Sequence, residues 1–284
     1  MAQIAKVSVI GATGHVGGQV VSQLAKTEVT VRALARKPEA ASFPTGIEVV
    51  PGDLTAPETL IRALDGVDAV YLTWPNLPPD NVIPVVEVIA EHARRIVLLS
   101  SAAVHDDLEE QDNPIGKVHA LLEEPIRNSG LEWTFLRPYG FATNTLEWAP
   151  QIRTGNVVRG AYGAASMTLL HEADIAAVAV RALTTDEHIG ARYELSGPSS
   201  LTRAEQVATI GAALGRPLVW EEITREQAKA QMDWAPAEFA DYILGGLAAM
   251  VDTPGQPTST VQQVTGSPAR SYAQWVADHA ADFA

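Results

Sequence analysis

The chain has 284 residues, of which 46% are hydrophobic and 19% charged, proportions typical of a folded globular protein. The formal net charge of −14 excludes a broad basic surface for nucleic acid, although a few clustered cations could still hold a small anion. The chain contains no cysteine, which excludes disulfides and thiolate chemistry and fits a cytoplasmic location. No apolar run reaches the roughly 18 residues that span a bilayer, so no membrane partner is expected.

Short β-branched runs alternate with helical stretches over the first half of the chain. Strands are expected at 6–10, 29–35, 47–51, 69–73, 95–100 and 133–137. Helices are expected between them at 16–25, 57–64, 81–94 and 117–128. This alternation predicts an α/β fold of the Rossmann type, a doubly wound parallel sheet with helices on both faces and right-handed crossovers.

After Pro138 the alternation weakens. Helices are expected at 172–184, 202–214, 224–232 and 237–251, strands at 192–195 and 218–221, and a last amphipathic helix at 268–283. We therefore expect an NAD(P)-binding domain over residues 1–150. A smaller α/β region over residues 151–284 would cap the cofactor, bind the substrate and be interleaved with the first domain.

A glycine-rich loop follows the first strand and opens the first helix. Its sequence is Gly11-Ala12-Thr13-Gly14-His15-Val16-Gly17. In this position the first glycine permits a tight turn, the second lets a pyrophosphate approach the backbone, and the third lets the helix pack close to the strand. The alternative is an ordinary strand–helix turn. The context of strand, glycines and helix favours dinucleotide binding through the backbone, with the helix N-terminus facing the phosphates.

Three cations lie near the end of the second strand, where NAD-preferring proteins usually carry an acidic residue. They are Arg32, Arg36 and Lys37, and no acid occurs before Glu39. Arg36 is expected to bind the 2′-phosphate of NADP(H), with Lys37 second, whereas Arg32 could point to the other side of the sheet. NADP(H) is therefore the expected cofactor and NAD(H) the alternative.

The chain resembles the NmrA-like group of atypical short-chain dehydrogenases/reductases over nearly its whole length. The resemblance rests on the glycine loop, on Gly52-Asp53-Leu54, on the segment 129–138 ending in Phe135-Leu136-Arg137-Pro138, and on Asp174-Ile175-Ala176. It implies that Asp53 and Leu54 border the adenine. It also places Leu72, Thr73 and Ser100 near the ribose and nicotinamide. Further contacts on the nicotinamide side are implied for Pro138, Tyr139, Gly140 and Phe141.

The usual proton relay of the wider superfamily is absent. Its members carry a Tyr-x-x-x-Lys pair on the helix before the sixth strand, often with a glutamate four residues after the lysine. Aligning that glutamate with Glu123 puts His119 in the lysine position and Ile115 in the tyrosine position. No tyrosine occurs between Tyr71 and Tyr139, so a small shift in alignment does not restore the pair.

Two functions are compatible with this absence. The first is an NADPH-dependent reductase of a ketone or quinone carbonyl in a bulky, aromatic, polyketide-like substrate of secondary metabolism. Its proton would come from solvent, from the substrate, or from His119, Ser101 or Tyr139. The alternative is a non-catalytic sensor that binds NAD(P)(H) and regulates a partner. The aromatic residues of the second half favour the reductase, with Phe141 and Trp148 as the first candidates for a substrate pocket.

Two further groups have plainer explanations. His171, Glu172 and Asp174 fit a helix start, with carboxylates in the first turn, better than a metal site. The acidic run 106–112 is expected to be a solvated loop. The sequence leaves the oligomeric state open.

Overall fold

The computed structural model describes residues 3–75 and 78–284. These residues form two compact units, each assembled from separate stretches of the chain. The first unit contains residues 1–138, 172–195 and 263–266, and the second contains residues 139–171, 196–262 and 267–284.

The first unit is built on a seven-stranded sheet in which every pairing is parallel. Its order is β3-β2-β1-β4-β5-β6-β9. The strands are β1 (Lys6–Ile10), β2 (Thr30–Ala35), β3 (Glu48–Pro51), β4 (Ala69–Thr73), β5 (Arg95–Leu99), β6 (Glu132–Pro138) and β9 (Ala191–Leu195). The strand order reverses at β1, and such a switch point places a ligand crevice at the carboxyl ends of β1 and β4. The Rossmann-type fold is confirmed.

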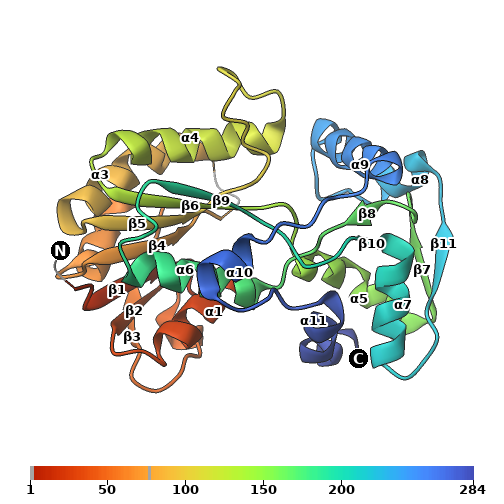
Figure 1. Ribbon diagram of the computed structural model, residues 1–284, viewed down its shortest axis with the longest axis horizontal. Helices are drawn as coiled ribbons and strands as arrows, with labels where there is room; N and C mark the ends of the chain where they lie inside the picture. The colour runs from red at the N-terminus through yellow and green to blue at the C-terminus, as the bar shows by residue number, and fades with distance from the viewer. Residues whose placement is uncertain (1–2, 76–77) are drawn as a thin grey trace. The chain divides into compact units, whose positions relative to one another are not determined.

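Helices cover both faces of this sheet (Figure 1). On one face α1 (His15–Leu24) packs against α6 (Glu172–Thr184). On the other face lie α2 (Ile61–Leu64), α3 (Val82–His92) and α4 (Pro114–Asn128). Short 3₁₀ turns complete the connections: η1 (Pro38–Ala40), η2 (Pro57–Leu60) and η3 (Pro79–Asn81).

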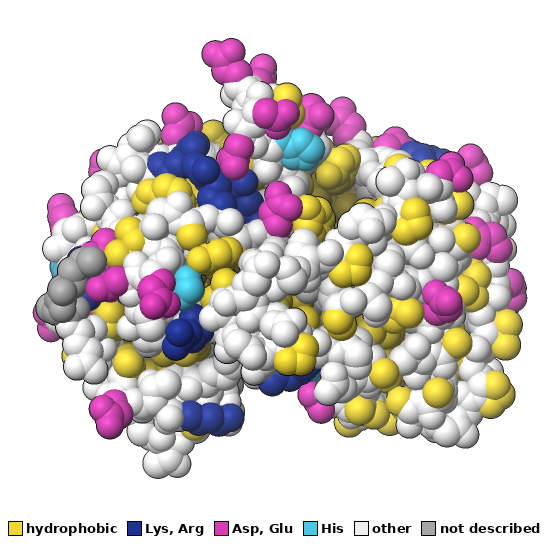
Figure 2. Space-filling view, viewed as in Figure 1, with side chains coloured by type: hydrophobic (Ala, Val, Ile, Leu, Met, Phe, Trp, Pro, Cys, Tyr) yellow, Lys and Arg dark blue, Asp and Glu magenta, His cyan; other side chains and the backbone are white. Residues whose placement is uncertain are grey.

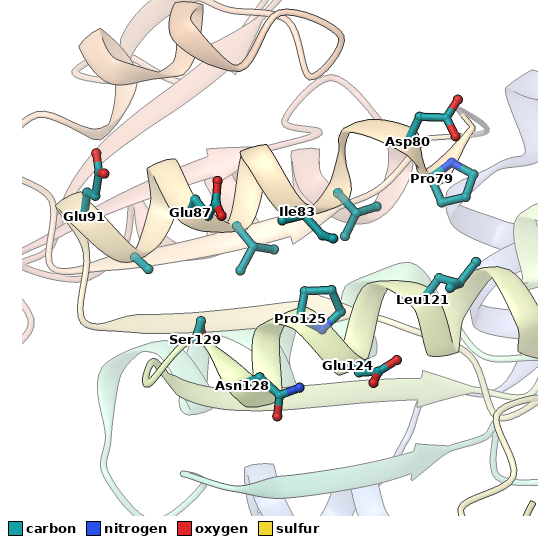
Figure 3. A pocket seen from close by; sticks show the side chains of 13 residues that line it. Pro79, Asp80, Ile83, Glu87, Glu91, Leu121, Glu124, Pro125, Asn128 and Ser129 are labelled. Atoms are coloured by element: carbon teal, nitrogen blue, oxygen red, sulfur yellow. The ribbon is translucent and has the colours of Figure 1, made fainter. Parts of the chain in front are cut away.

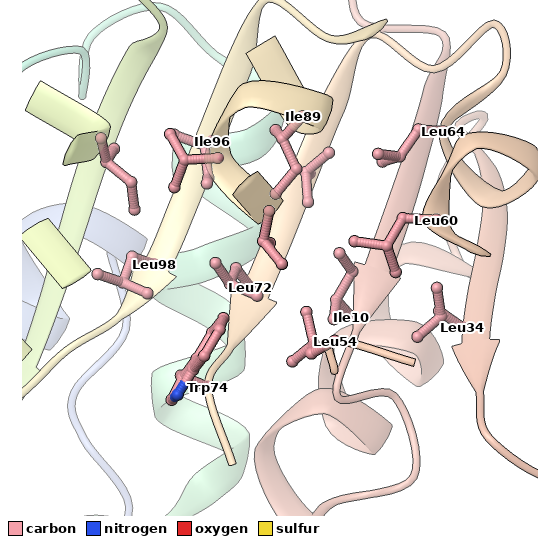
Figure 4. Packing of buried hydrophobic residues seen from close by; sticks show 14 of the residues in the cluster. Ile10, Leu34, Leu54, Leu60, Leu64, Leu72, Trp74, Ile89, Ile96 and Leu98 are labelled. Carbon is pink, nitrogen blue, oxygen red and sulfur yellow. The ribbon is translucent and has the colours of Figure 1, made fainter. Parts of the chain in front are cut away.

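A continuous apolar core fills the space between the sheet and α2, α3 and α4 (Figure 4). Ile10, Leu72 and Ile96 enter it from three neighbouring strands, and Leu64 and Ile89 enter it from the helices; each is at most 1% exposed. Branched and straight aliphatic side chains from alternating elements thus hold the strands in the register that aligns their carboxyl ends.

The second unit has two small sheets, β7 (Val157–Gly160) with β11 (Val219–Glu222), and β8 (Ser166–Met167) with β10 (Leu201–Thr202). Its helices are α5 (Ala149–Thr154), α7 (Arg203–Ala213), α8 (Arg225–Ala230), α9 (Ala237–Asp252) and α11 (Tyr272–Asp278), with 3₁₀ segments η4 (Ala142–Trp148) and η5 (Ala280–Phe283). The short helix α10 (Thr260–Thr265) lies where the chain passes between the units.

Two sequence-based helix bounds were wrong for reasons the structure makes clear. Helix α4 begins at Pro114 rather than at 117, because the side chain of Asn113 accepts a hydrogen bond from the Gly116 amide at 2.6 Å and caps the helix. The expected single helix at 268–283 is two pieces. Ser271 and Gln274 form a capping box that starts α11, and the helix ends at Asp278 before η5.

None of the helices in the described part of the chain is both long and apolar enough to cross a lipid bilayer.

Candidate functional site

The glycine loop connects β1 to α1 at the point where the strand order reverses. Gly11 adopts a positive φ of 86°, which an L side chain would strain, and the Gly14 amide donates to the Gly11 carbonyl at 3.0 Å. Gly14 is the N-cap of α1 and has no side chain with which to cap the first amides of the helix. No side chain of Gly14 therefore caps the helix N-terminus, whose amides and dipole can attract an anion.

Two of the glycines are required by close backbone contacts. A Cβ at Gly17 would lie 2.1 Å from the Gly11 carbonyl oxygen, and a Cβ at Gly11 would lie 2.8 Å from Cβ of Thr73. The loop, the first turn of α1 and the end of β4 thus meet without intervening side chains. This cradle fits the pyrophosphate of a dinucleotide, which must approach the main chain closely.

The other expected residues of the loop differ in their solvent exposure. Thr13 and His15 are exposed, whereas Val16 is buried against the core, so only its backbone can reach a ligand. Leu54 and Leu72 are likewise buried in the apolar core. Contacts of these three residues with a cofactor remain predictions, and they would have to be made by main-chain atoms.

Arg32 does not belong to the expected cation cluster. It is 6% exposed, and its Nε donates to Glu48 at 2.9 Å. Its Nη1 donates to the carbonyls of Arg62 and Asp65, both at 2.9 Å. Arg32 thus ties β2 to β3 and α2.

Arg36 and Lys37 remain exposed just beyond the carboxyl end of β2. Arg36 lies near Asp53, at the end of β3. The amide and hydroxyl of Thr55 lower the pKa of the Asp53 carboxyl, and the charge of Arg36 adds to the effect. A 2′-phosphate would meet the two exposed cations here, and this contact remains a prediction.

Ser100 follows β5 and is held by a buried ionic group that sequence reasoning missed. Its Oγ donates to Glu123 of α4 at 2.6 Å. Arg137 of β6 binds the same carboxylate, and it also donates to both oxygens of Asp106 at 3.0 and 2.9 Å. These bonds to Arg137 lower the pKa of Asp106. Asp106 is exposed, as expected of a solvated loop, but it is also paired with Arg137, which sequence reasoning did not predict.

His119 lies on α4 one turn before Glu123. Its Nδ1 is buried and has no hydrogen-bond partner among the described residues. Burial lowers the pKa of His119 to about 4, and the nearby Glu123 carboxylate opposes this effect only in part. The imidazole is therefore neutral at pH 7, where it is a poor proton donor.

Three candidate residues belong to the second unit. Tyr139 is 53% exposed and Phe141 is half-buried. Trp148 is 3% exposed and packs in the apolar core of that unit, where the Arg203 guanidinium lies 5.1 Å from its ring centre. Packing alone accounts for Trp148, and a substrate contact for Phe141 or Trp148 remains a prediction.

A groove of about 1110 Å³ lies between α3 and α4 in the first unit (Figure 3). Ile83 and Leu121 line it from the two helices, and Glu87 and Glu124 stand beside them. None of the expected cofactor residues lines this groove. Within residues 3–75 and 78–284, no cluster of three or more His, Asp or Glu side chains could hold a metal ion, and His171 directly precedes α6, as expected of a helix start.

Acidic side chains are scattered over the visible face of the molecule, whereas lysines and arginines gather in a few places (Figure 2). The loop between β5 and α4 projects from its unit and carries carboxylates at its tip (Figures 1 and 2). An anionic cofactor would therefore be attracted by local groups, and the N-terminus of α1 and the cations beyond β2 remain the predicted ones.

Known proteins resemble this chain along its whole length. A family model described as NAD(P)H-binding matches residues 11–186. The chain is 39% identical over 280 residues to a (4-alkanoyl-5-oxo-2,5-dihydrofuran-3-yl)methyl phosphate reductase of Streptomyces griseus, covering 97% of this chain and 98% of that one. It is 33% identical over 290 residues to an NAD(P)H azoreductase of Xenophilus azovorans, with 97% and 98% covered. The structure of an NADPH-dependent quinone oxidoreductase from Escherichia coli, complexed with NADPH, superposes with a TM-score of 0.78 at 24% identity and covers 96% of this chain and 99% of that one.

The substitution Gly17→Ala should weaken NADPH binding by at least about tenfold, because its Cβ would force the Gly11 carbonyl to move. Gly18→Ala is the matched control. Its Cβ would lie 3.5 Å from the Ala12 carbonyl, an ordinary contact on the same helix. A fluorescence titration of NADPH gives both dissociation constants, and equal affinity of the two variants would contradict the cradle.

The substitution Arg36→Ala should weaken NADPH binding by about 10- to 100-fold and leave NADH binding within about twofold, because only NADPH carries the 2′-phosphate. Lys26→Ala, at an exposed position of the same unit, removes the same charge and controls for the overall field. Titrating both cofactors against all three proteins measures the effect. An equal loss for NADH and NADPH would refute the clamp.

Stability should fall in acid partly because of His119. The folded state disfavours its charged form, with a pKa of about 4 against 6.5 for the ordinary side chain. The stability it provides is present above pH 6.5 and is lost as the pH falls from 6.5 towards 4, by about 1–2 kcal/mol at pH 5. Urea unfolding at pH 7 and pH 5 should show a smaller acid loss in His119→Gln than in wild type. His105→Gln, at an exposed position, should show the wild-type loss, and an unchanged acid loss in His119→Gln would refute the assignment.

Proposed function

This chain belongs to the NAD(P)H-binding family and is an NAD(P)H-dependent oxidoreductase, and we propose that it reduces an electron-poor conjugated acceptor without a protein acid. Bound NADPH supplies a hydride to the acceptor, and solvent supplies the proton that balances the reaction. The acceptor class comprises quinones, polycyclic aromatic ketones and ring C=C bonds conjugated to carbonyl groups. This class is wider than the aromatic carbonyl compounds favoured by the sequence alone.

The observation that carries this proposal is the composition of α4. When α4 is aligned on Glu123, Ile115 and His119 fall where the wider short-chain superfamily carries the tyrosine and lysine of its proton relay. Isoleucine has no proton to give. The neutral imidazole of His119 is also a poor acid near pH 7, because its pKa is lowered to about 4. A reaction that builds a localised alkoxide would lack its usual proton source here.

A conjugated acceptor removes the need for that acid. When hydride adds to one end of such a system, the negative charge spreads over the carbonyl oxygens, and the resulting anion is a weak enough base for water to protonate. The enzyme then contributes chiefly by holding donor and acceptor at reacting distance and orientation. This division of labour fits a phosphate cradle combined with the absence of a tyrosine from α4.

The names of the relatives support the same class. Azo compounds and quinones are conjugated acceptors. The Streptomyces relative is named for a dihydrofuranone whose ring C=C is flanked by a ring carbonyl and an alkanoyl group, and which carries a phosphomethyl group. Because that relative is 39% identical over nearly the whole chain, an acyl dihydrofuranone phosphate is the first acceptor to try.

The residues proposed to hold the cofactor lie at the carboxyl ends of the first four strands. The amides of the glycine loop and the N-terminus of α1 would bind the pyrophosphate. Arg36 and Lys37 would bind the 2′-phosphate, which makes NADP(H) the proposed cofactor. Asp53 would border the adenosine, and Thr73 would approach the nicotinamide ribose.

The test is a panel of matched acceptors assayed by NADPH consumption. Each conjugated compound is paired with an analogue that keeps the carbonyl but lacks the conjugation, for example cyclohexenone with cyclohexanone and an acyl dihydrofuranone phosphate with its saturated lactone. A naphthoquinone and an azo dye complete the panel. We expect kcat/KM for the conjugated member to exceed that of its partner by at least about 100-fold, a difference of about 3 kcal/mol in the barrier.

Two outcomes would contradict the proposal. Equal rates for conjugated and unconjugated ketones would mean that the protein does supply an acid. Tight NADPH binding without turnover of any acceptor would instead favour a sensor, in which cofactor occupancy alters a contact with a partner.

A further inference from the structure

A buried ion pair in the first unit joins α4 to β6 near the carboxyl edge of the sheet. Glu123 is 1% exposed and Arg137 is 3% exposed. Nε and Nη2 of Arg137 donate to the two carboxylate oxygens at 2.9 and 2.6 Å. Because this pairing is bidentate and charge-assisted, it fixes the orientation of the Glu123 carboxyl group.

The pair is connected to the segment that directly follows β5, residues 100–104, here called the β5 corner. The Ser100 hydroxyl donates to Glu123 Oε1 at 2.6 Å, and the Ser100 amide donates to the Leu136 carbonyl at 2.7 Å. On its other side Arg137 binds Asp106, just beyond the corner. One line of charged bonds thus fixes the β5 corner against both α4 and β6.

The hydroxyl groups of the two serines in the corner play opposite roles, one as donor and the other as acceptor. The single hydroxyl proton of Ser100 is committed inward to Glu123. Ser101 Oγ instead accepts a hydrogen bond from the Ala103 amide at 3.2 Å, and its carbonyl accepts from the Val104 amide at 3.2 Å. Among the described residues, the Ser101 hydroxyl has no acceptor for its own proton, so it can donate to a bound molecule.

We propose that Glu123, bound by Arg137, is a positioning residue for reduction: it holds the β5 corner so that the Ser101 hydroxyl donates to the oxygen on which negative charge develops. This inference rests on the proposed function and deepens it. Hydrogen-bond stabilisation of the oxyanion by a fixed donor does not require proton transfer from the protein, so it is compatible with a site that lacks an acid. Glu123 acts through Ser100 and the corner and does not touch the acceptor itself.

A purely stabilising role is the competing explanation, and the same strand provides a comparison for it. At the opposite end of β5, Arg95 is 1% exposed and pairs with Glu132 at 2.8 Å. Its guanidinium also donates to carbonyls in the last turn of α6 and to that of Thr185, just after the helix, at 2.7 Å. A buried ion pair is by itself weak evidence of a stabilising purpose. The two pairs lie at opposite ends of the sheet, and the Glu132 side chain is 23% exposed whereas that of Glu123 is 1% exposed.

The experiment compares Glu123→Gln with Glu132→Gln, using the full chain and whichever conjugated acceptor wild type reduces fastest. Glu123→Gln should lower kcat by about 10- to 100-fold while the KM for NADPH changes less than about threefold. Glu132→Gln should leave kcat within about twofold. Ser100→Ala, which leaves the ion pair in place, should reproduce the kcat loss and serves as the second variant if Glu123→Gln does not fold.

A double-mutant comparison tests whether Glu123 acts through the corner. Ser101→Ala should lower kcat, and adding Glu123→Gln to it should cause little further loss, because the donor that Glu123 positions is already gone. Losses that multiply in the double variant would overturn the inference, as would a wild-type kcat in both Glu123→Gln and Ser100→Ala.

Amide hydrogen exchange on the cofactor-free protein gives a measurement that needs no turnover. Glu123→Gln should speed exchange at residues 100–104, and Glu132→Gln should not. Unchanged exchange at the corner would overturn the inference whatever the activity. Absence of wild-type turnover with every acceptor, combined with faster exchange in Glu123→Gln, would contradict the proposed function while leaving the anchoring of the corner supported.

Discussion

The site depends on one steric constraint: the main chain of the glycine loop must touch both its own helix and the end of β4. The space that a Cβ would need at Gly17 is occupied by the Gly11 carbonyl, and the space at Gly11 by the side chain of Thr73. These contacts bring the N-terminus of α1 to the carboxyl ends of β1 and β4, where the strand order reverses. The other expected cofactor contacts of the first unit lie at the carboxyl ends of neighbouring strands. The parallel pairing of these strands sets their positions relative to the cradle.

The chain and its cofactor are both negatively charged, so binding depends on where the few positive groups of the protein lie. With a formal net charge of −14, the protein cannot attract a dinucleotide phosphate by its overall field. The predicted binding groups are the α1 terminus and Arg36 and Lys37, which stay exposed while Arg32 is used within the fold. Some acidic residues are paired with local cations, as Asp106 is with Arg137. Selectivity for an anion thus comes from a few directed groups at short range, where salt screens them least.

The sequence predicted the first unit well because that unit obeys local rules. Its strands are β-branched runs, its helices carry one apolar face, and the glycines fall where backbone contact demands them. Prediction was poorer where a distant partner decides the outcome. Nothing local in Arg32 or Arg137 distinguishes an arginine in a buried pair from one in solvent, and Asp106 is separated from its partner by α4. The 3₁₀ turn of η4 and the short strands β7, β8 and β10 were also missed, because two to seven residues hold too little periodicity to be recognised. Glu123 had a detectable signal, its spacing from the relay positions, but that signal gave no hint of Ser100.

The loss of the relay residues and the survival of the glutamate can be understood together. In a reductase that forms a localised alkoxide, tyrosine and lysine supply a proton and the ribose contact. A conjugated acceptor spreads its charge and makes the proton dispensable, so Ile115 and a neutral His119 can occupy the same helix face without penalty. An oxyanion still forms on a carbonyl oxygen, however, and it still needs a donor in a fixed place. In the proposed reaction Glu123 and Arg137 would meet that remaining requirement, because the Glu123 carboxyl group fixes the direction of the Ser100 hydroxyl and with it the corner that carries Ser101. On this proposal, α4 contributes to orientation and not to acid catalysis.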